Sequence, residues 1–268
     1  MKMKFRKVFP LLLVLIMALS ITACGGDSSD KGNKEQSGEQ TALELYNAAN
    51  KQLEGSDSYS AAMDTKMSMD VAGQKMDVTM VADMKQQNMG DNPKLEMDMA
   101  TTSMGQEMEM KAYYKDGYYY MDSNGQKIKM KMDVADVMKQ MGSASLEIGK
   151  DAVKEQSVTD GQDGKELNMT LDGQKIMDQA SGLMAGLDQY SAMADEMKMG
   201  DMSLNAVVGE DGNLKSTDID FSITMTIQKQ ETTMDAKVTM DIEKIGGIKV
   251  EFPDDLDSYK ETEANTAS

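Results

Sequence analysis

The side chains in this sequence that could do chemistry are the thioethers of its 30 methionines, because the chain contains no histidine and only one cysteine. Met-x-Met pairs on predicted strands include Met67/Met69, Met97/Met99, Met108/Met110 and Met130/Met132. Residues two positions apart on a β-strand point to the same face, so each pair would place two sulfurs side by side. Thioethers are soft ligands that suit Cu(I). Copper binding by methionine is therefore one hypothesis.

Three other roles for methionine stay open, because any methionine-rich strand with a buried face produces the same spacing. Methionine matches leucine in volume and can simply fill a core. It also fills irregular space and repacks around varied ligands, which favours a plastic apolar groove. Finally, exposed thioethers can reduce oxidants. Methionine also recurs at positions typical of helix faces, which favours packing over metal binding: Met138, Met141, Met184, Met193 and Met197.

No pattern in the chain indicates an enzyme. Gly-x-Ser-x-Gly, Ser-x-x-Lys and phosphate-binding loop motifs are all missing from the sequence. The 46 acidic residues make chance pairs of carboxylates common, so no acid–base pair stands out. The Asp-Gly steps do not match a calcium-binding loop and indicate turns instead. We therefore assign no catalytic residue, no metal site and no cofactor.

The N-terminus has the order of a secretory signal peptide. Four basic residues precede an apolar run over Leu11–Leu19, which is short for a membrane-spanning helix. The segment Ile21–Cys24 then resembles the lipobox of bacterial lipoproteins. The resemblance implies cleavage before Cys24 and attachment of diacylglycerol, with acyl chains such as palmitate, to its sulfur. Cys24 is the only cysteine, so an intrachain disulfide is impossible.

Residues 24–40 are predicted to form a lipidated, disordered tether, because Gly25–Gln40 carries no apolar side chain. Removal of residues 1–23 would take away four basic and no acidic residues, which changes the net charge from −18 to −22. A protein this acidic is repelled by phosphates, so nucleic acid is excluded as a partner. The polar residues 260–268 are predicted to be a disordered tail.

Hydrophobic periodicity predicts a helix over Thr41–Gly55, with the capping-box spacing of Thr41 and Glu44. The period then changes from 3.6 to 2 and indicates six strands in an antiparallel meander, with tight turns at Asp116-Gly117 and Asn124-Gly125. The tyrosines around these turns are expected to pair across strands rather than to stack on a ligand.

The second half of the chain repeats the change of period. A short helix is predicted after Asp133, a strand over Leu167–Leu171, and a second helix from Ile176 to Leu187, with Met197 as its alternative end. Three strands follow between residues 202 and 242, and a last short strand is predicted over Ile248–Phe252. The total is about ten strands, each with one apolar and one charged face.

Two segments carry a family resemblance: the helix-to-strand passage Tyr46–Asp70 and the double hairpin Tyr113–Met130. They resemble a group of Gram-positive lipoproteins of unassigned function. That group is similar in turn to the lipoprotein carriers LolA and LolB and to the mycobacterial proteins LppX and LprG. The resemblance implies an open half-barrel in which acyl chains bind between the sheet and the helices.

Together, the sequence predicts an α+β domain over residues 41–259, built as a large curved antiparallel sheet with helices packed on its apolar face. Two half-domains of the same type are the alternative architecture. The function expected is non-catalytic binding of a lipid, a lipopeptide or another amphiphile by a lipoprotein anchored outside the cytoplasm. An envelope interaction protein with a filled core is the main alternative, and Cu(I) binding is a minor one. The residues expected to line the groove are Met67, Met69, Met76, Met80, Met97, Met99, Met108, Met110, Met130 and Met132.

Overall fold

The computed structural model describes residues 40–71, 74–88, 92–131, 148–184, 197–227 and 230–262. Within them the helices are α2 (Ala42–Glu54) and α4 (Gly173–Met184), with the 3-10 turns η2 (Lys150–Ala152) and η3 (Leu256–Ser258). The strands are β1 (Ser58–Val71), β2 (Gln74–Gln87), β3 (Lys94–Ser103), β4 (Gln106–Lys115), β5 (Tyr118–Ser123), β6 (Gln126–Lys131), β7 (Val153–Asp160), β8 (Lys165–Leu171), β9 (Met197–Met199), β10 (Met202–Val208), β11 (Leu214–Ile227), β12 (Gln230–Ile245) and β13 (Lys260–Glu261).

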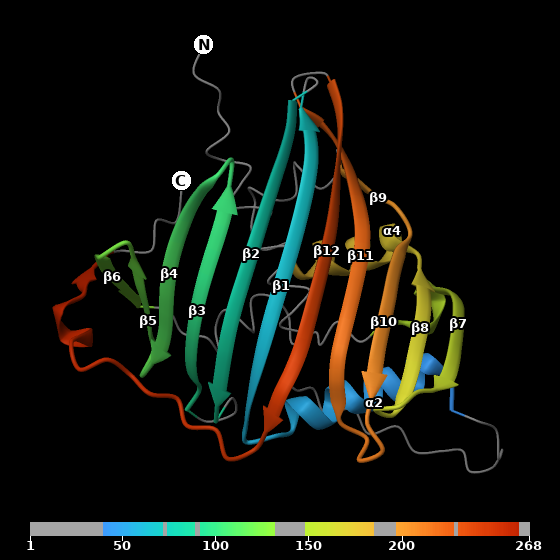
Figure 1. Cartoon of the computed structure of the whole chain (residues 1–268), viewed down its shortest axis with the longest axis horizontal. Coiled ribbons are helices and arrows are strands. Elements are labelled where there is room, and N and C mark those ends of the chain that lie inside the picture. Colours follow the sequence, from blue (N-terminus) through green and yellow to red (C-terminus); the bar gives the residue numbers. More distant parts are fainter. Residues whose placement is uncertain are drawn as a thin grey trace.

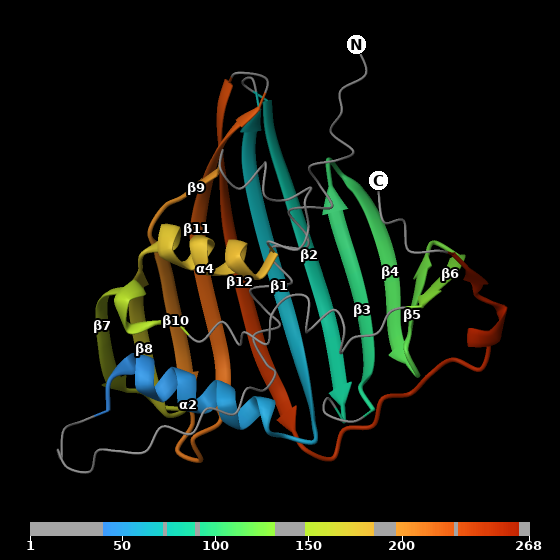
Figure 2. The ribbon, with the colours of Figure 1, turned by 180° about the vertical axis from the view of Figure 1, so that it is seen from behind.

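All these strands belong to one sheet in the order β13-β6-β5-β4-β3-β2-β1-β12-β11-β10-β8-β7, with β9 paired to β11. Every pair is antiparallel except that of β13 with β6. The sheet is open and strongly twisted, and both described helices lie on the same face of it (Figures 1 and 2). The predicted fold class is confirmed. The expected number of strands was too low, since β7, β9 and β13 were not predicted.

The meander β1–β6 forms as its sequence predicts. The angle φ is positive at both central residues of each predicted tight turn. It is 50° at Asp116 and 79° at Gly117, and 50° at Asn124 and 81° at Gly125. This conformation belongs to the two-residue hairpin turn, whose twist matches that of the strands it joins. Tyr113 pairs with Tyr120 across β4 and β5. The tyrosines therefore form cross-strand pairs, as expected.

The first and last long strands join two halves of the sheet. β1 pairs with β12 from Tyr59 opposite Ile245 to Met69 opposite Met234. On its other side β1 pairs with β2 along its whole length. The two meanders predicted from the sequence thus form a single continuous surface.

Helix α2 begins with the predicted capping box. The Thr41 hydroxyl accepts a hydrogen bond from the backbone N–H of Glu44 (3.2 Å), and the Glu44 carboxylate accepts one from the backbone N–H of Thr41 (3.1 Å). These hydrogen bonds hold the pKa of Glu44 below its usual value. The buried face of the helix packs mainly against β7, β8, β10 and β11. Its buried residues are Ala42, Leu43, Tyr46, Ala49 and Leu53.

Helix α4 starts at a close contact between two glycines. A Cβ atom on Gly173 would lie 1.9 Å from the carbonyl oxygen of Gly200, so only glycine permits this approach. The Asp172 carboxylate accepts a hydrogen bond from the backbone N–H of Lys175 and caps the helix. The Gln174 side chain accepts a further one from the backbone N–H of Met199 on β9. The sequence predicts Met197 as an alternative end of this helix. In the structure Met197 instead begins the strand β9.

Two further predictions need correction, and two lie outside the described residues. Ile248–Phe252 is not a strand, because its backbone N–H groups bond to side chains at the ends of β1, β2 and β3 instead of to a neighbouring strand. The predicted tail is ordered over 260–262, where Lys260–Glu261 forms β13. The predicted helix after Asp133 lies outside the described residues, as do residues 1–39, which contain the predicted signal peptide and Cys24.

The C-terminal segment 246–262 runs past the ends of β1, β2 and β3 to the edge of the sheet at β6 (Figure 1). We call this segment the strap. It reaches the outer face of β4–β6, where Leu256 and Tyr259 are buried with Tyr113 in a second, smaller core. The Tyr259 ring meets the Tyr120 ring edge to face, with centroids 5.5 Å apart. The Lys127 ammonium lies 5.5 Å from the centroid of the Tyr259 ring. Aromatic packing therefore holds the strap to the edge of the sheet.

We expect Tyr259→Ala to lower the free energy of unfolding by about 2–4 kcal/mol, because it removes a buried ring and leaves a cavity. Tyr259→Phe keeps the ring and should cost less than about 1 kcal/mol. Urea denaturation of the full chain measures both values. Equal losses for the two variants would show that the ring does not hold the strap.

Candidate ligand-binding site

The register places all the predicted groove residues within the described chain on one face of the sheet, the face that carries α2 and α4. Met69 lies opposite Met76 on β2 and opposite Met234 on β12. Met99 lies opposite Met110 on β4. Such cross-strand neighbours have Cβ atoms about 5 Å apart. The methionines therefore form continuous rows across the strands.

This face carries no charge over most of its width. Within the regular register from β6 across the sheet to β10, every described, paired residue that shares the parity of the methionines is uncharged. Lys244 lies beyond the register shift of β12 and is opposite Ser60, which faces outward. The opposite parity holds the aspartates, glutamates and lysines. A face of this kind can hold an apolar surface, because no charged group has to lose its water of hydration on contact. We call it the uncharged face.

The predicted groove residues differ in exposure. Those that are buried are Met67, Met80, Met97 and Met99. Those that are half-buried are Met69, Met76, Met110 and Met130. Met108 is 44% exposed, and Met132 lies outside the described residues. Their assignment to a ligand site stays a prediction.

Other residues of the uncharged face were not predicted as site residues. They include Met63, Thr65, Met84, Met121 and Met240. The alternation of inward and outward residues along each strand would have identified them. The Met84 sulfur accepts a hydrogen bond of 3.2 Å from the Gln86 side chain.

The two described helices cover one part of the uncharged face. The principal contacts of α2 are with β7, β8, β10 and β11, and those of α4 are with β9 and η2. In Figure 2 both helices cross the half of the sheet that holds β7–β12. Gln156 of β7 accepts a hydrogen bond from the backbone N–H of Leu43, and Asn47 donates one to the carbonyl of Ile148. These bonds fix α2 over β7 and its neighbours, and the face continues beyond it toward β6.

Burial raises the pKa values of phenol groups on and next to this face. It raises the pKa of Tyr119, since an ionised phenol would lose its hydration there. Burial raises the pKa of Tyr46 on α2 as well, although the side chains of Asn50 and Thr217 act in the opposite direction. Both phenols are therefore neutral at physiological pH.

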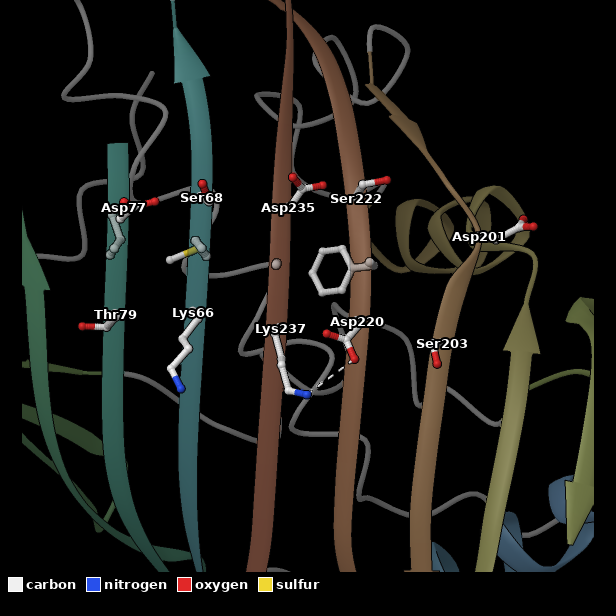
Figure 3. A pocket seen from close by; sticks show the side chains of 14 residues that line it. Lys66, Ser68, Asp77, Thr79, Asp201, Ser203, Asp220, Ser222, Asp235 and Lys237 are labelled. Carbon is white, nitrogen blue, oxygen red and sulfur yellow. Dashed lines mark ion pairs between the residues drawn. The ribbon is translucent and has the colours of Figure 1, made fainter. Parts of the chain in front are cut away.

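A shallow trough of about 660 Å³ crosses β2, β1, β12, β11 and β10. Its polar lining comes from the outer face, where Lys66 lies directly opposite Lys237 (Figure 3). The Lys237 ammonium lies 3.8 Å from the carboxylates of both Asp218 and Asp220. These ion pairs are exposed and contribute little to stability. Of the predicted methionines only Met67 lines the trough, so it is not the predicted groove.

Among the described residues, no three His, Cys, Asp or Glu side chains gather in a way that could hold a metal ion. In the same part of the chain no helix is long and apolar enough to cross a membrane. The described residues thus define a large open antiparallel sheet with two helices on an uncharged, methionine-rich face.

A sequence model of the family of unknown function DUF6612 matches residues 41–260. The chain belongs to this family. No curated protein matches the chain by sequence.

Solved structures of similar fold include the lipoprotein LppX of Mycobacterium tuberculosis, at 12% identity and a TM-score of 0.42, with 78% of this chain and 98% of LppX aligned. A putative outer membrane lipoprotein-sorting protein domain from Vibrio parahaemolyticus aligns at 9% identity and a TM-score of 0.26, over 81% of this chain and 96% of that domain. These neighbours are of the kind that the sequence led us to expect. At such identities and scores they assign no ligand to this chain.

Oxidation should rank the methionines by exposure. Hydrogen peroxide converts thioethers to sulfoxides. We expect Met104 and Met108, which are 80% and 44% exposed, to react first. Met80 is fully buried and should stay reduced until the protein unfolds. Peptide mass spectrometry over a time course, with a parallel series in urea, measures the order. Equally fast oxidation of Met80 and Met104 in the folded protein would show that the centre of the uncharged face is open to solvent.

Proposed function

We propose that the protein is an extracytoplasmic lipoprotein, held at the membrane by a lipid on Cys24, which binds the acyl part of an amphipathic ligand on its uncharged face. The ligand would be a lipid or a lipopeptide. The proposal includes residues 24–40 as a tether and residues 41–259 as the binding domain. No step of chemistry is required of the protein.

One observation carries the proposal: the uncharged face extends past the principal contacts of α2 and α4, across the methionines of β2–β4. A sheet that needed only to pack against α2 and α4 would place polar residues beyond their contacts. Here the paired positions stay uncharged as far as β6. Acyl chains have the chemistry that such a face accepts, because burial of each CH₂ group contributes about 0.8 kcal/mol.

The choice of methionine supports a variable ligand over a single rigid one. Its unbranched side chain has three rotatable bonds and adjusts to irregular contacts. Met69, Met76 and Met110 are only half-buried, so their side chains have room to move. A face built from valine or isoleucine would hold a more fixed shape.

The first test uses a matched pair of variants and a fluorescent fatty acid. Met110→Glu puts a charge on the uncharged face, opposite the buried Met99. Because an unpaired charge in apolar surroundings costs several kcal/mol, we expect the affinity for the probe to fall at least about tenfold. Val81→Glu makes the same change on the outer face, where Val81 is 50% exposed, and should leave the affinity unchanged.

Two results would contradict the binding proposal. One is a wild-type protein that takes up no probe and gives only its own mass in native mass spectrometry after purification from membranes. This result would favour the alternative of an interaction protein with a filled core. The other is an equal loss of affinity in Met110→Glu and Val81→Glu.

The second test concerns the anchor. Cys24→Ser removes the only thiol in the chain and with it the proposed point of attachment. We expect this variant to lose incorporation of labelled palmitate and to move from the membrane fraction to the soluble or secreted fraction, since two acyl chains give stable anchoring. Ser20→Ala, which changes a small residue upstream of the proposed cleavage point, is the control and should remain labelled. Labelling of Cys24→Ser at the wild-type level would exclude Cys24 as the lipid site.

A further inference from the structure

Thr65 is a buried polar residue at the centre of the uncharged face. It lies midway along β1, which occupies the middle of the sheet between β2 and β12. Its side chain is fully buried, and within the described chain its hydroxyl has no hydrogen-bond partner. A buried hydroxyl without a partner destabilises a fold, so native proteins rarely keep one without a reason.

The neighbours of Thr65 on this face explain why its hydroxyl has no partner. Met80 and Val238 lie directly opposite it on the two adjacent strands. Met63 and Met67 flank it along β1. A valine has no acceptor, and a thioether is only a weak one. An ordered water is no substitute, because a buried water needs two to four polar partners and these neighbours provide none.

Thr217 offers a contrast on the part of the face that α2 covers. Its hydroxyl is also buried and, among the described residues, also has no hydrogen-bond partner, but it lies by the phenol of Tyr46 and acts to lower the pKa of that phenol. Thr217 therefore has a polar neighbour supplied by the protein. Thr65 has no polar neighbour among the described residues that surround it on the sheet, so its hydroxyl is free to bond to a molecule bound on the face.

We infer that Thr65 is the polar anchor of the binding face, and that its hydroxyl donates a hydrogen bond to the carbonyl oxygen of a bound acyl ester or acid. The inference rests on the proposed function and specifies its ligand. The hydroxyl hydrogen needs an acceptor, and the carbonyl is the acceptor that every acyl chain carries at its head. The methionines around Thr65 would then contact the hydrocarbon. Pockets for small molecules commonly combine an apolar lining with a few polar groups that fix orientation.

The test compares two probes that differ in the carbonyl, methyl palmitate and hexadecane, on the full chain. Thr65→Val keeps the shape of the side chain and removes the hydroxyl. We expect it to weaken binding of methyl palmitate about 3- to 10-fold, the effect of one neutral hydrogen bond, and to leave hexadecane unchanged. Thr65→Ser keeps the hydroxyl and should retain the preference for the ester. Thr217→Val is the matched control and should change neither affinity.

The outcomes separate this inference from the proposed function. If wild type binds both probes and Thr65→Val weakens both equally, or neither, then Thr65 has only a packing role and the inference is wrong while the proposed function stands. If wild type binds neither probe, both are wrong. Thr65→Val should also melt at a higher temperature than wild type without ligand, because an unpaired hydroxyl is gone. A lower melting temperature would show that the hydroxyl is already paired within the protein, and would overturn the inference.

Discussion

The pairing of β1 with β12 is the interaction on which the rest of the structure depends. β1 opens the first meander and β12 closes the second, and their register is continuous apart from one irregularity near Ser60. Without this pair the chain would form two smaller sheets, each with an additional exposed edge. With it, the apolar sides of both meanders become one surface, and α2, which precedes β1, can cover strands from the C-terminal half. The pairing is distant in sequence, so its formation must follow that of the local hairpins.

The strict alternation along these strands separates two surfaces of opposite character. Charged residues occupy the outer face, where cross-strand pairs such as Lys111 with Asp98, at 3.1 Å, stay in contact with water. Such pairs add little stability, and the large negative charge of the chain serves solubility. The inner positions need only be apolar and of moderate size. Methionine meets that condition at little cost relative to leucine, and at the same time leaves the surface deformable.

Sequence periodicity predicted the hairpins well, because each strand carries its own signal of alternation and its own turn. The capping box of Thr41 and Glu44 placed the first helix for a similar local reason. β7 was missed since most of its side chains are exposed, which leaves no alternation to detect. The strand expected at Ile248–Phe252 had the right pattern, but its hydrogen-bond partners are side chains such as Gln87. Thr65 could be placed on the inner face from parity, whereas its lack of a partner depends on neighbours from two other strands.

The strap has a consequence for how molecules of this protein meet one another. An open sheet ends in strands whose backbone groups can recruit a strand from another copy, which is the first step of edge-to-edge aggregation. β13 occupies the free side of β6 at Ile128 and Lys129, and the backbone N–H of Thr262 bonds to the carbonyl of Lys129 beyond it. The remaining outward side chains of β6 include Lys127 and Lys131. At the opposite end of the sheet β7 is rich in exposed polar residues. Both borders are thus protected against polymerisation, which would matter most for a protein concentrated on a membrane surface.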